Sequence, residues 1–278
     1  IRIGPDHTGW ASPWFLVAVE DPKTDDVVVF TCNRSIDTEK LNSPHIYYPS
    51  HTNDVDDLLA LEADSSEDWK LVKKTKKAMI FRKKSPENDL VPPIIKADLH
   101  LQGIPYKTAV QYFTDWEVRQ RWDKTFGVVD ILEKIGKFKV VYCSNKMPTF
   151  CKNRDMVLAC LDHPGQQYHI QIMCSILHPV VPQNLKTNKI RANTSSFGII
   201  IRPVDDGTQS SKVTVITQVD LKGSAPKFIK NGYLENNPIK WIKMMKKYYK
   251  KHGHEEEAGA KDQGTTESIN NNVDDVIA

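Results

Sequence analysis

Residues 213–251 of the chain read VTVITQVDLKGSAPKFIKNGYLENNPIKWIKMMKKYYKK. The first part, residues 213–219, is rich in β-branched residues and predicts a strand. From Pro226 to about Lys251 the apolar residues recur at helical spacing, and proline is favoured in the first turn of a helix. The segment therefore predicts a strand that is followed by a long C-terminal helix.

This helix has two separate faces when its residues are placed about 100° apart. The apolar face holds Trp241, Ile242, Met244, Met245, Tyr248 and Tyr249. The basic face holds Lys240, Lys243, Lys246, Lys247, Lys250 and Lys251. Such a helix can close a cavity with one face and meet anionic headgroups with the other, with Lys243 and Lys247 as docking candidates. A solvated lysine face is the plainer alternative, and Pro238 predicts a kink near the helix start.

Upstream, strand-like runs and turn residues alternate with few helical stretches. A short helix with Asn53 as its cap precedes three strands, and a helical stretch runs from Pro105 towards Asp123. The predicted strands are residues 69–74, 78–83, 94–101, 128–132, 138–144, 156–161, 168–176, 195–201 and 213–219. A long antiparallel sheet bracketed by helices predicts an α+β fold in which the curved sheet closes around the C-terminal helix. The gap between sheet and helix is a candidate ligand cavity.

The two ends of the chain have a different character. Residues 1–41 read as a short all-β fragment with strands at 14–19 and 27–32, and residues 42–59 as a linker and the start of a helix. Residues 253–278 hold seven acids and one lysine, which predicts a disordered acidic tail. Without this tail 37 basic and 28 acidic residues remain, and this surplus favours an anionic partner such as a membrane surface or nucleic acid.

The five cysteines form no Cys-x-x-Cys pair: Cys32, Cys143, Cys151, Cys160 and Cys174. Four lie in or beside strand-like runs, so buried thiols are favoured over a metal site or a disulfide framework. A reducing compartment fits this pattern. No run approaches the roughly 18 apolar residues of a membrane span. We therefore expect a cytoplasmic, peripherally membrane-associated monomer without a cofactor.

Four short motifs follow one another in a characteristic order. They are Arg119-Gln-Arg-Trp-Asp123, Asn153-Arg-Asp155, Ser175-Ile-Leu-His-Pro179 and Asp220-Leu-Lys-Gly-Ser-Ala-Pro226. The series resembles the START (steroidogenic acute regulatory protein-related lipid transfer) domain over residues 60–252. The resemblance implies a helix-grip fold that encloses one lipid, and a non-enzymatic function in which a phospholipid or other polar lipid is transferred between membranes.

The first residues resemble a second family. A Gly-x-Asp-x-x-Gly loop at residues 4–9, followed by Trp14-Phe-Leu16 and Phe30-x-Cys-Asn-Arg34, is similar to the later half of a PLAT (lipoxygenase-homology) domain. Ser35 stands where that family usually has tryptophan. The similarity covers about 37 residues and implies an incomplete domain.

The START resemblance also implies candidate lipid-binding residues. Arg119 and Asp123 match positions that contact the headgroup in the phosphatidylcholine transfer protein, and Phe113 matches a tyrosine there. An arginine in a cavity can hold phosphate through two hydrogen bonds, whereas a solvated ion pair is the alternative. The remaining candidates for the cavity lining are Arg154, Cys143, Met156, Ser195 and Phe197.

These positions do not reproduce one known specificity. Cys143, Met156 and Ser195 replace the three aromatic residues of a choline cage, so phosphatidylcholine is not the default ligand. The amide-bearing partners of the ceramide transfer protein fall on Cys143 and Met173. A sterol-carrier arginine corresponds to Arg154, whose acidic partner falls on Ser144, and a structural ion pair between Arg154 and Asp155 is equally compatible. The resemblance therefore does not name the lipid.

The loop from His178 to Asn188 contains Val180, Val181 and Leu185 but no acid. In START domains the corresponding loop covers the cavity mouth, so we expect a gate and a membrane contact here. Ordinary packing of the apolar tip is the alternative.

Two other classes of function are less compatible with the sequence. Helix-grip enzymes exist, but no pair of nucleophile and base and no metal-ligand pattern is evident, so we predict no catalytic residue and no metal site. Nucleic-acid binding is disfavoured because the lysine face lacks interleaved aromatic residues and arginines. A scaffold that senses a bound lipid without transferring it remains an open alternative.

Overall fold

The computed structural model describes residues 15–20, 27–32, 51–84, 92–148, 150–176, 178, 180–181, 188–204, 209–223 and 226–270. Within these ranges, only the backbone is described for residues 15–20, 27–32, 51–54, 135, 195–197, 227–229 and 254–270.

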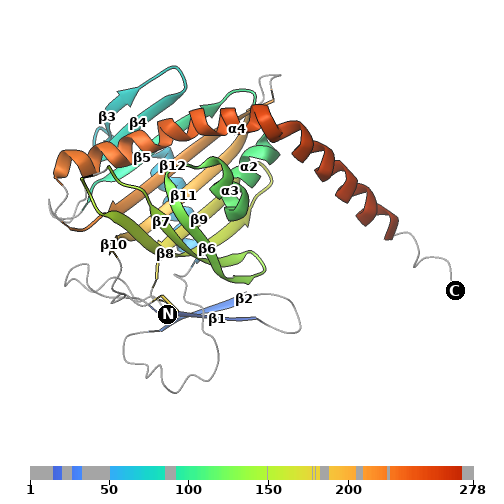
Figure 1. The fold of residues 1–278 in the computed structure, drawn as a ribbon, viewed down its shortest axis with the longest axis horizontal. Helices are drawn as coiled ribbons and strands as arrows, with labels where there is room; N and C mark the ends of the chain where they lie inside the picture. Colours follow the sequence, from blue (N-terminus) through green and yellow to red (C-terminus); the bar gives the residue numbers. More distant parts are fainter. Residues whose placement is uncertain are drawn as a thin grey trace.

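The main element is a ten-stranded sheet (Figure 1). Its strands are β3 (Lys70–Lys74), β4 (Ala78–Lys83), β5 (Ile94–Leu101), β6 (Phe126–Ile135), β7 (Phe138–Asn145), β8 (Asn153–Pro164), β9 (His169–Ser175), β10 (Lys189–Arg191), β11 (Asn193–Val204) and β12 (Ser210–Asp220). The order across the sheet is β3-β4-β5-β12-β11-β9-β8-β7-β6, and neighbouring strands on this path are antiparallel. Because β5 pairs with β12, the sheet places β3, β4 and β5, which come first in the chain, next to β12, which comes last.

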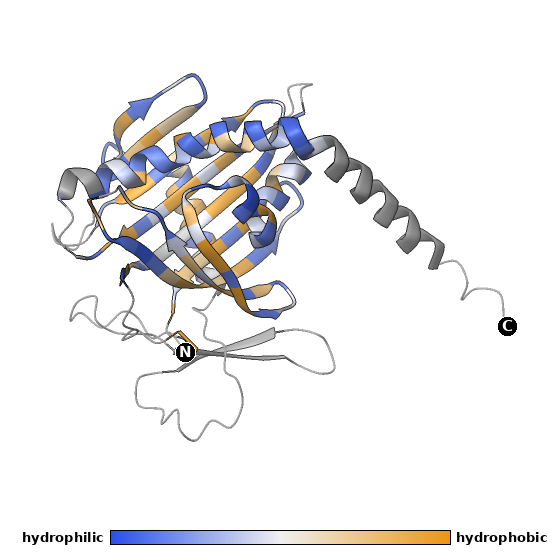
Figure 2. Ribbon diagram, in the orientation of Figure 1, coloured by the Kyte–Doolittle hydropathy of each residue, from blue (hydrophilic) through white to orange (hydrophobic). Residues whose placement is uncertain are grey.

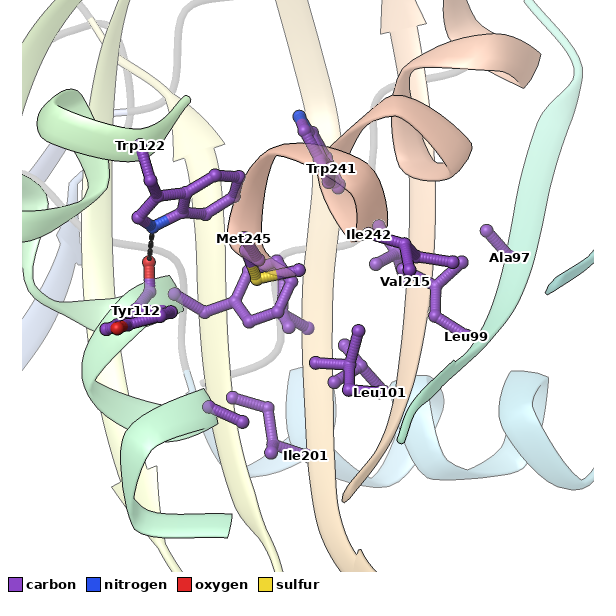
Figure 3. Close-up of a cluster of buried hydrophobic side chains, with 14 of the residues drawn as sticks. Ala97, Leu99, Leu101, Tyr112, Trp122, Ile201, Val215, Trp241, Ile242 and Met245 are labelled. Carbon is purple, nitrogen blue, oxygen red and sulfur yellow. Dashed lines mark hydrogen bonds between the residues drawn. The ribbon is translucent and has the colours of Figure 1, made fainter. Parts of the chain in front are cut away.

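The helices lie on both faces of the sheet. They are α1 (His51–Ala63), α2 (Tyr106–Thr114), α3 (Trp116–Trp122) and α4 (Lys227–Asn270). α2, α3 and α4 pack with the inner-face side chains of the sheet in the largest hydrophobic cluster, part of which is drawn in Figure 3. The indole Nε1 of Trp122 donates to the carbonyl of Tyr112 at 2.8 Å and joins α3 to α2. This arrangement confirms the predicted α+β fold, an antiparallel curved sheet that packs against the C-terminal helix.

Helix α1 covers the opposite face of the sheet. Val55 and Leu58 pack there against isoleucines of β9, β11 and β12. Gly198 of β11 lies under Leu58, and a Cβ at this position would come within 2.3 Å of Leu58 Cδ2. The close approach explains why the strand has a glycine at this point.

Several helix boundaries differ from the prediction. The predicted helix from Pro105 to Asp123 is divided at Asp115, which has extended backbone angles and accepts hydrogen bonds from the backbone N–H of Glu117 and Val118. Asp115 thus caps α3, because an aspartate side chain satisfies N–H groups that lack a partner at a helix start. Asn53 was predicted as a cap but lies inside α1, which begins at His51.

The sheet also contains a strand that the sequence did not predict. β10 has three residues and pairs parallel with the start of β8, and β8, β11 and β12 are longer than predicted. At the N-terminus, β1 (Phe15–Glu20) and β2 (Val27–Cys32) form an antiparallel pair, which confirms the two predicted strands.

Helix α4 continues beyond the predicted end at Lys251 and reaches Asn270. Residues 253–270, predicted as disordered, therefore have helical backbone. Their sequence includes Glu, Ala and Lys, which are good helix formers, and extending an existing helix avoids the cost of nucleation. Residues 271–278 lie outside the described residues.

The burial of α4 confirms the two predicted faces. Trp241, Ile242 and Met245 are buried, whereas Lys243 and Lys247 are exposed. In Figure 2 mainly hydrophilic residues lie along the visible side of α4. None of the described helices combines the length and the apolar character needed to cross a bilayer.

Candidate functional site

A cavity of about 90 Å³ lies between the inner face of the sheet and helices α3 and α4. Its lining is mostly apolar, with a few polar side chains among the apolar ones. The lining residues are Trp116, Arg119, Thr125, Phe126, Cys143, Asn145, Met156, Leu158, Met173, Thr194, Val215, Thr217, Val219, Leu221, Tyr233, Leu234, Asn237, Pro238 and Trp241. Such an apolar space with a few convergent polar groups is typical of a ligand site.

Arg119 is the cation of this cavity. Its guanidinium carbon lies 5.0–5.7 Å from the ring centres of four aromatic residues, namely Phe113, Trp116, Phe126 and Trp241. Aromatic faces attract a cation at this distance and partly replace the water that burial removes. The rings therefore hold a charged side chain in an apolar region.

The hydrogen bonds of Arg119 are incomplete. Its Nη1 donates to the carbonyl of Phe113 at 3.3 Å, while its Nε has no hydrogen-bond partner among the described residues. Asp123 lies one helical turn further on, and its Oδ1 accepts from the N–H and hydroxyl of Thr125. The second oxygen, Oδ2, is 4.0 Å from Arg119 Nε, which is too long for a hydrogen bond. The pair thus keeps one unused donor and one unused acceptor.

Burial dominates the electrostatics of this pair. Burial lowers the pKa of Arg119, although the nearby Asp123 carboxylate opposes this shift. Burial likewise raises the pKa of Asp123, and the charge of Arg119 and the hydrogen bonds from Thr125 oppose the shift. A guanidinium keeps its charge in proteins, so the cavity retains a positive group.

Further polar atoms around the cavity are buried without a partner in the part of the chain that the structure describes. They are Trp116 Nε1, Thr217 Oγ1, Tyr233 OH, Asn237 Oδ1 and Trp241 Nε1. Tyr233 lies close to Asn237, and Trp241 lies close to Asp123, but neither contact has the geometry of a full hydrogen bond. Buried polar groups are nearly always hydrogen-bonded, so each exception needs an explanation. Together with Arg119 Nε, these donors and acceptors would be satisfied by a polar ligand group or by water.

Cys143 and Met156 line the cavity, as predicted, but neither side chain is aromatic. Burial raises the pKa of the Cys143 thiol to about 12, so it is not a nucleophile at neutral pH. Cys160 and Cys174 are also buried and form no disulfide, which confirms the prediction of buried thiols for these three cysteines. The side chains of Ser195 and Phe197 lie outside the described residues.

Three other candidates, Asp123, Phe113 and Arg154, are not among the residues that line the cavity. Phe113 is fully buried beside it, with its ring against those of Trp122 and Trp241. Arg154 was predicted to contact lipid or to pair with Asp155, but its Nε and Nη2 donate to the carbonyls of Leu221 and Lys222 at 2.8 Å. Its Nη1 donates to the carbonyl of Lys152. All three nitrogens are thus used to hold backbone, which is a structural role.

Asp155 pairs with a different arginine. Both of its oxygens accept from Arg191 of β10, each at 3.1 Å. This pair attaches β10 to the start of β8, while Arg154 attaches the segment between β12 and α4 to the same point. The Arg-Asp dipeptide therefore fixes two connections at one end of the sheet.

The loop predicted to cover the cavity is only partly described. Val180 is 71% exposed, whereas Val181 is partly buried against the cluster that contains Phe138. His178 holds the base of the loop, since its Nε2 lies 2.8 Å from Glu133 Oε1 and its Nδ1 is 3.3 Å from the N–H of Val180. Leu185 lies outside the described residues.

Sequence reasoning missed Tyr233 and Asn237 as cavity residues. They form a stripe with Trp241 at four-residue spacing, which places all three on one side of α4. The spacing was available in the sequence. The amphipathic pattern in the sequence is clear only after Pro238, and the stripe begins before it with two polar side chains.

An α+β fold in which a C-terminal helix closes an internal apolar cavity defines a class of ligand-enclosing proteins. A family model described as START domain matches residues 52–255. The chain belongs to the START domain family. The family match begins after the N-terminal strands, so the PLAT resemblance of the first 37 residues stays a prediction.

Two curated relatives show the degree of similarity. Human START domain-containing protein 10 is 30% identical over 157 residues, 56% of this chain and 52% of the relative. The mitochondrial steroidogenic acute regulatory protein of Oncorhynchus mykiss is 28% identical over 153 residues, 54% of this chain and 52% of the relative. The chain thus spans about half the length of these curated relatives.

Solved structures share the fold. The crystal structure of human STARD10 has a TM-score of 0.65 at 23% identity, covering 77% of this chain and 84% of that one. Human StAR-related lipid transfer protein 5 has a TM-score of 0.62 at 15% identity, covering 71% and 95%.

Proposed function

We propose that this chain binds one polar lipid in the cavity and transfers it between membranes without changing it chemically. The observation that carries the proposal is the group of unpartnered polar atoms around Arg119 in an otherwise apolar cavity. A lipid headgroup supplies the acceptors and donors that these atoms lack, while its acyl chains match the apolar lining. The names of relatives such as the ceramide transfer protein of Pongo abelii support transfer.

The cavity is too small to hold a lipid with long chains, so lipid binding requires that part of the protein moves. The space of about 90 Å³ is far below the roughly 300–1,000 Å³ of pockets that enclose small molecules. A lipid with long chains therefore enters only when α4 moves outwards. The segment before α4 is held by Arg154, so we propose that this junction is where α4 turns.

Membrane docking completes the proposal. The exposed Lys243 and Lys247 of α4 face an anionic headgroup layer, and Val180 contacts the layer at the loop. Phe150, in the turn between β7 and β8, is 73% exposed and is a further apolar contact. We keep the expectation of a cytoplasmic, monomeric and peripherally bound protein as part of this proposal.

Lipid transfer between vesicles tests the function. The purified chain would be incubated with donor vesicles carrying a series of fluorescent lipids, and the products would be separated by chromatography. Transfer of an intact lipid is expected. A cleaved product would replace the proposal with an enzyme, and binding without transfer would favour a lipid-sensing scaffold.

Substitution of Arg119 tests the site. Arg119→Ala should weaken binding of the transferred phospholipid by about 1.5–3 kcal/mol, which is typical of a hydrogen bond to a charged group. Arg121 lies on the same helix but is exposed, so Arg121→Ala is the matched control and should bind normally. Equal binding by both variants and the native chain would remove Arg119 from the headgroup site.

A further inference from the structure

The hairpin of β3 and β4 runs alongside α4. Arg82 forms an ion pair with Glu235, Lys73 Nζ donates to Asn236 Oδ1 at 2.5 Å, and Lys77 at the turn lies next to Lys246. Residues 235–246 of a helix span about 16 Å, and residues 77–82 of a strand span about the same length. The hairpin therefore follows α4 for about three turns (Figure 1).

The contact at the hairpin turn joins two like charges. Burial lowers the pKa of Lys246, and Lys77 lowers it further. No ion pair between described residues gives either lysine a carboxylate partner. Two ammonium groups held side by side repel each other, and a bound anion between them would remove this cost.

A surface groove adjoins the same turn. It has a volume of about 470 Å³, and four of its lining residues are Lys74, Lys76, Lys77 and Lys212. Asp98 is the one carboxylate among its lining residues. The lining also includes apolar residues such as Met79, which is 38% exposed. A groove lined by both lysines and apolar side chains fits an anionic amphiphile.

An exposed leucine extends the apolar part of this surface. Leu71 is 46% exposed, and the strand register places it opposite Phe81. Residues 79 and 81 point to the same face of β4, so Leu71 and Met79 share one face of the hairpin. A surface that combines lysines with exposed aliphatic side chains is suited to the boundary between headgroups and acyl chains.

We propose that the β3–β4 hairpin docks on an anionic lipid bilayer with the face that points away from α4. The groove holds a lipid phosphate, and Met79 and Leu71 enter the headgroup region. This surface is separate from the lysines of α4, because Ala78 and Ile80 of β4 pack in the cluster that contains Met245, whereas Leu71 and Met79 are exposed on the opposite face. The inference goes beyond the proposed function because it assigns a membrane site that does not depend on which lipid the cavity holds.

Vesicle co-sedimentation tests the hairpin. Lys76→Gln with Lys77→Gln should weaken binding to vesicles of equal parts phosphatidylcholine and phosphatidylserine by roughly 25-fold, about fivefold for each lysine lost near the surface. Neither the native chain nor the variant should bind vesicles of phosphatidylcholine alone. Met79→Ser should weaken binding to the anionic vesicles while leaving the charge unchanged.

A second hairpin provides the matched control. Lys134 and Lys137 flank the turn between β6 and β7, at the opposite edge of the sheet, and both are exposed. Lys134→Gln with Lys137→Gln removes the same charge and should leave vesicle binding unchanged. An equal loss in the two double variants would overturn the proposal, because net charge alone would then explain binding. Tighter binding of the native chain to RNA than to anionic vesicles would also overturn it.

Cavity loading separates this inference from the proposed function. Native mass spectrometry of each variant should show the same bound lipid as in the native chain. Loss of docking with normal loading supports the hairpin site alone. An empty cavity in the native chain, combined with hairpin-dependent docking, would reject the proposed lipid transfer and leave the docking surface intact.

Discussion

Arg119 Nε and Asp123 Oδ2 lie 4.0 Å apart with side chains that are 2% and 0% exposed, so the structure buries an ion pair without a direct hydrogen bond between these atoms. Each atom also lacks another hydrogen-bond partner among the described residues. A buried pair is favourable only when its geometry and surrounding hydrogen bonds offset the loss of water. This arrangement therefore lowers the stability of the ligand-free protein at the point where a ligand would bind.

Removing one member of the pair should destabilise the fold. Arg119→Met leaves the carboxylate of Asp123 buried without its counter-charge and should lower the free energy of unfolding by about 3–5 kcal/mol. Arg119→Met with Asp123→Asn should recover most of this loss, because neither charge remains. Urea denaturation of the two single variants and the double variant measures the coupling. Additive effects would mean that the two side chains do not interact.

The pair should also give stability a specific dependence on pH. Burial raises the pKa of Asp123 above its ordinary value of 3.8, so the folded state binds a proton more tightly than the unfolded state. The contribution of Asp123 to stability therefore falls as pH rises from the ordinary value to the raised folded value. Asp123→Asn should remove this fall. Unfolding free energies of both proteins at several pH values give the difference, and parallel curves would contradict the prediction.

The polar stripe on α4 should oppose stability and support binding. Tyr233→Phe and Asn237→Leu each remove a buried polar atom that has no well-formed hydrogen bond among the described residues, although the two side chains lie close to each other. Replacing an unsatisfied group by an apolar one of similar shape is near neutral or stabilising, whereas a lost hydrogen bond to a ligand costs about 0.5–1.5 kcal/mol. Thermal unfolding should therefore be unchanged or higher, and lipid binding should be weaker. Variants that bind normally would show that these atoms do not contact the ligand.

The connection between β12 and α4 should respond to glycine in opposite ways at two neighbouring positions. Lys222 and Gly223 both have positive φ, 44° and 64°. Lys222→Gly removes the steric cost of this conformation and should raise the free energy of unfolding by up to about 1 kcal/mol. Gly223→Ala should lower it, since the new Cβ would lie 2.6 Å from Ile190 Cδ1. Chemical denaturation measures whether each variant raises or lowers the free energy of unfolding. A stabilised Gly223→Ala variant would contradict the predicted clash between the new Cβ and Ile190.

The regular elements were largely predictable. The ranges predicted for β4 and β5 agree with the structure at both ends, and the division of α4 into an apolar and a basic face agrees with its burial. These features depend on the repeat of side-chain direction along a strand or helix, which neighbouring residues determine. β10 was missed because its three residues are too few to show such a repeat, and it exists through pairing with β8.

The candidate site was only partly predictable. Arg119, Cys143 and Met156 line the cavity, whereas Phe113 lies behind it and Val181 is partly buried beside Phe138. Tyr233 and Asn237 enter the cavity because α4 packs with the stripe facing inwards. The position of a side chain relative to a cavity depends on helix packing across the sheet, and no short motif contains that information.

The sequence by itself determined the antiparallel sheet, the amphipathic terminal helix and the family, because periodicity and motif order are local properties of the chain. Arg119 and Arg154 each lie close to an aspartate in a short motif. Only the tertiary structure decided which of the two arginines lines the cavity. Arg119 is surrounded by four aromatic rings at the cavity and keeps an unused donor, whereas Arg154 gives its hydrogen bonds to three backbone carbonyls. The difference arises because the partners of Arg154 on the segment before α4 are more than 60 residues away in the chain and come close only when the strands from β8 to β12 pair in the sheet.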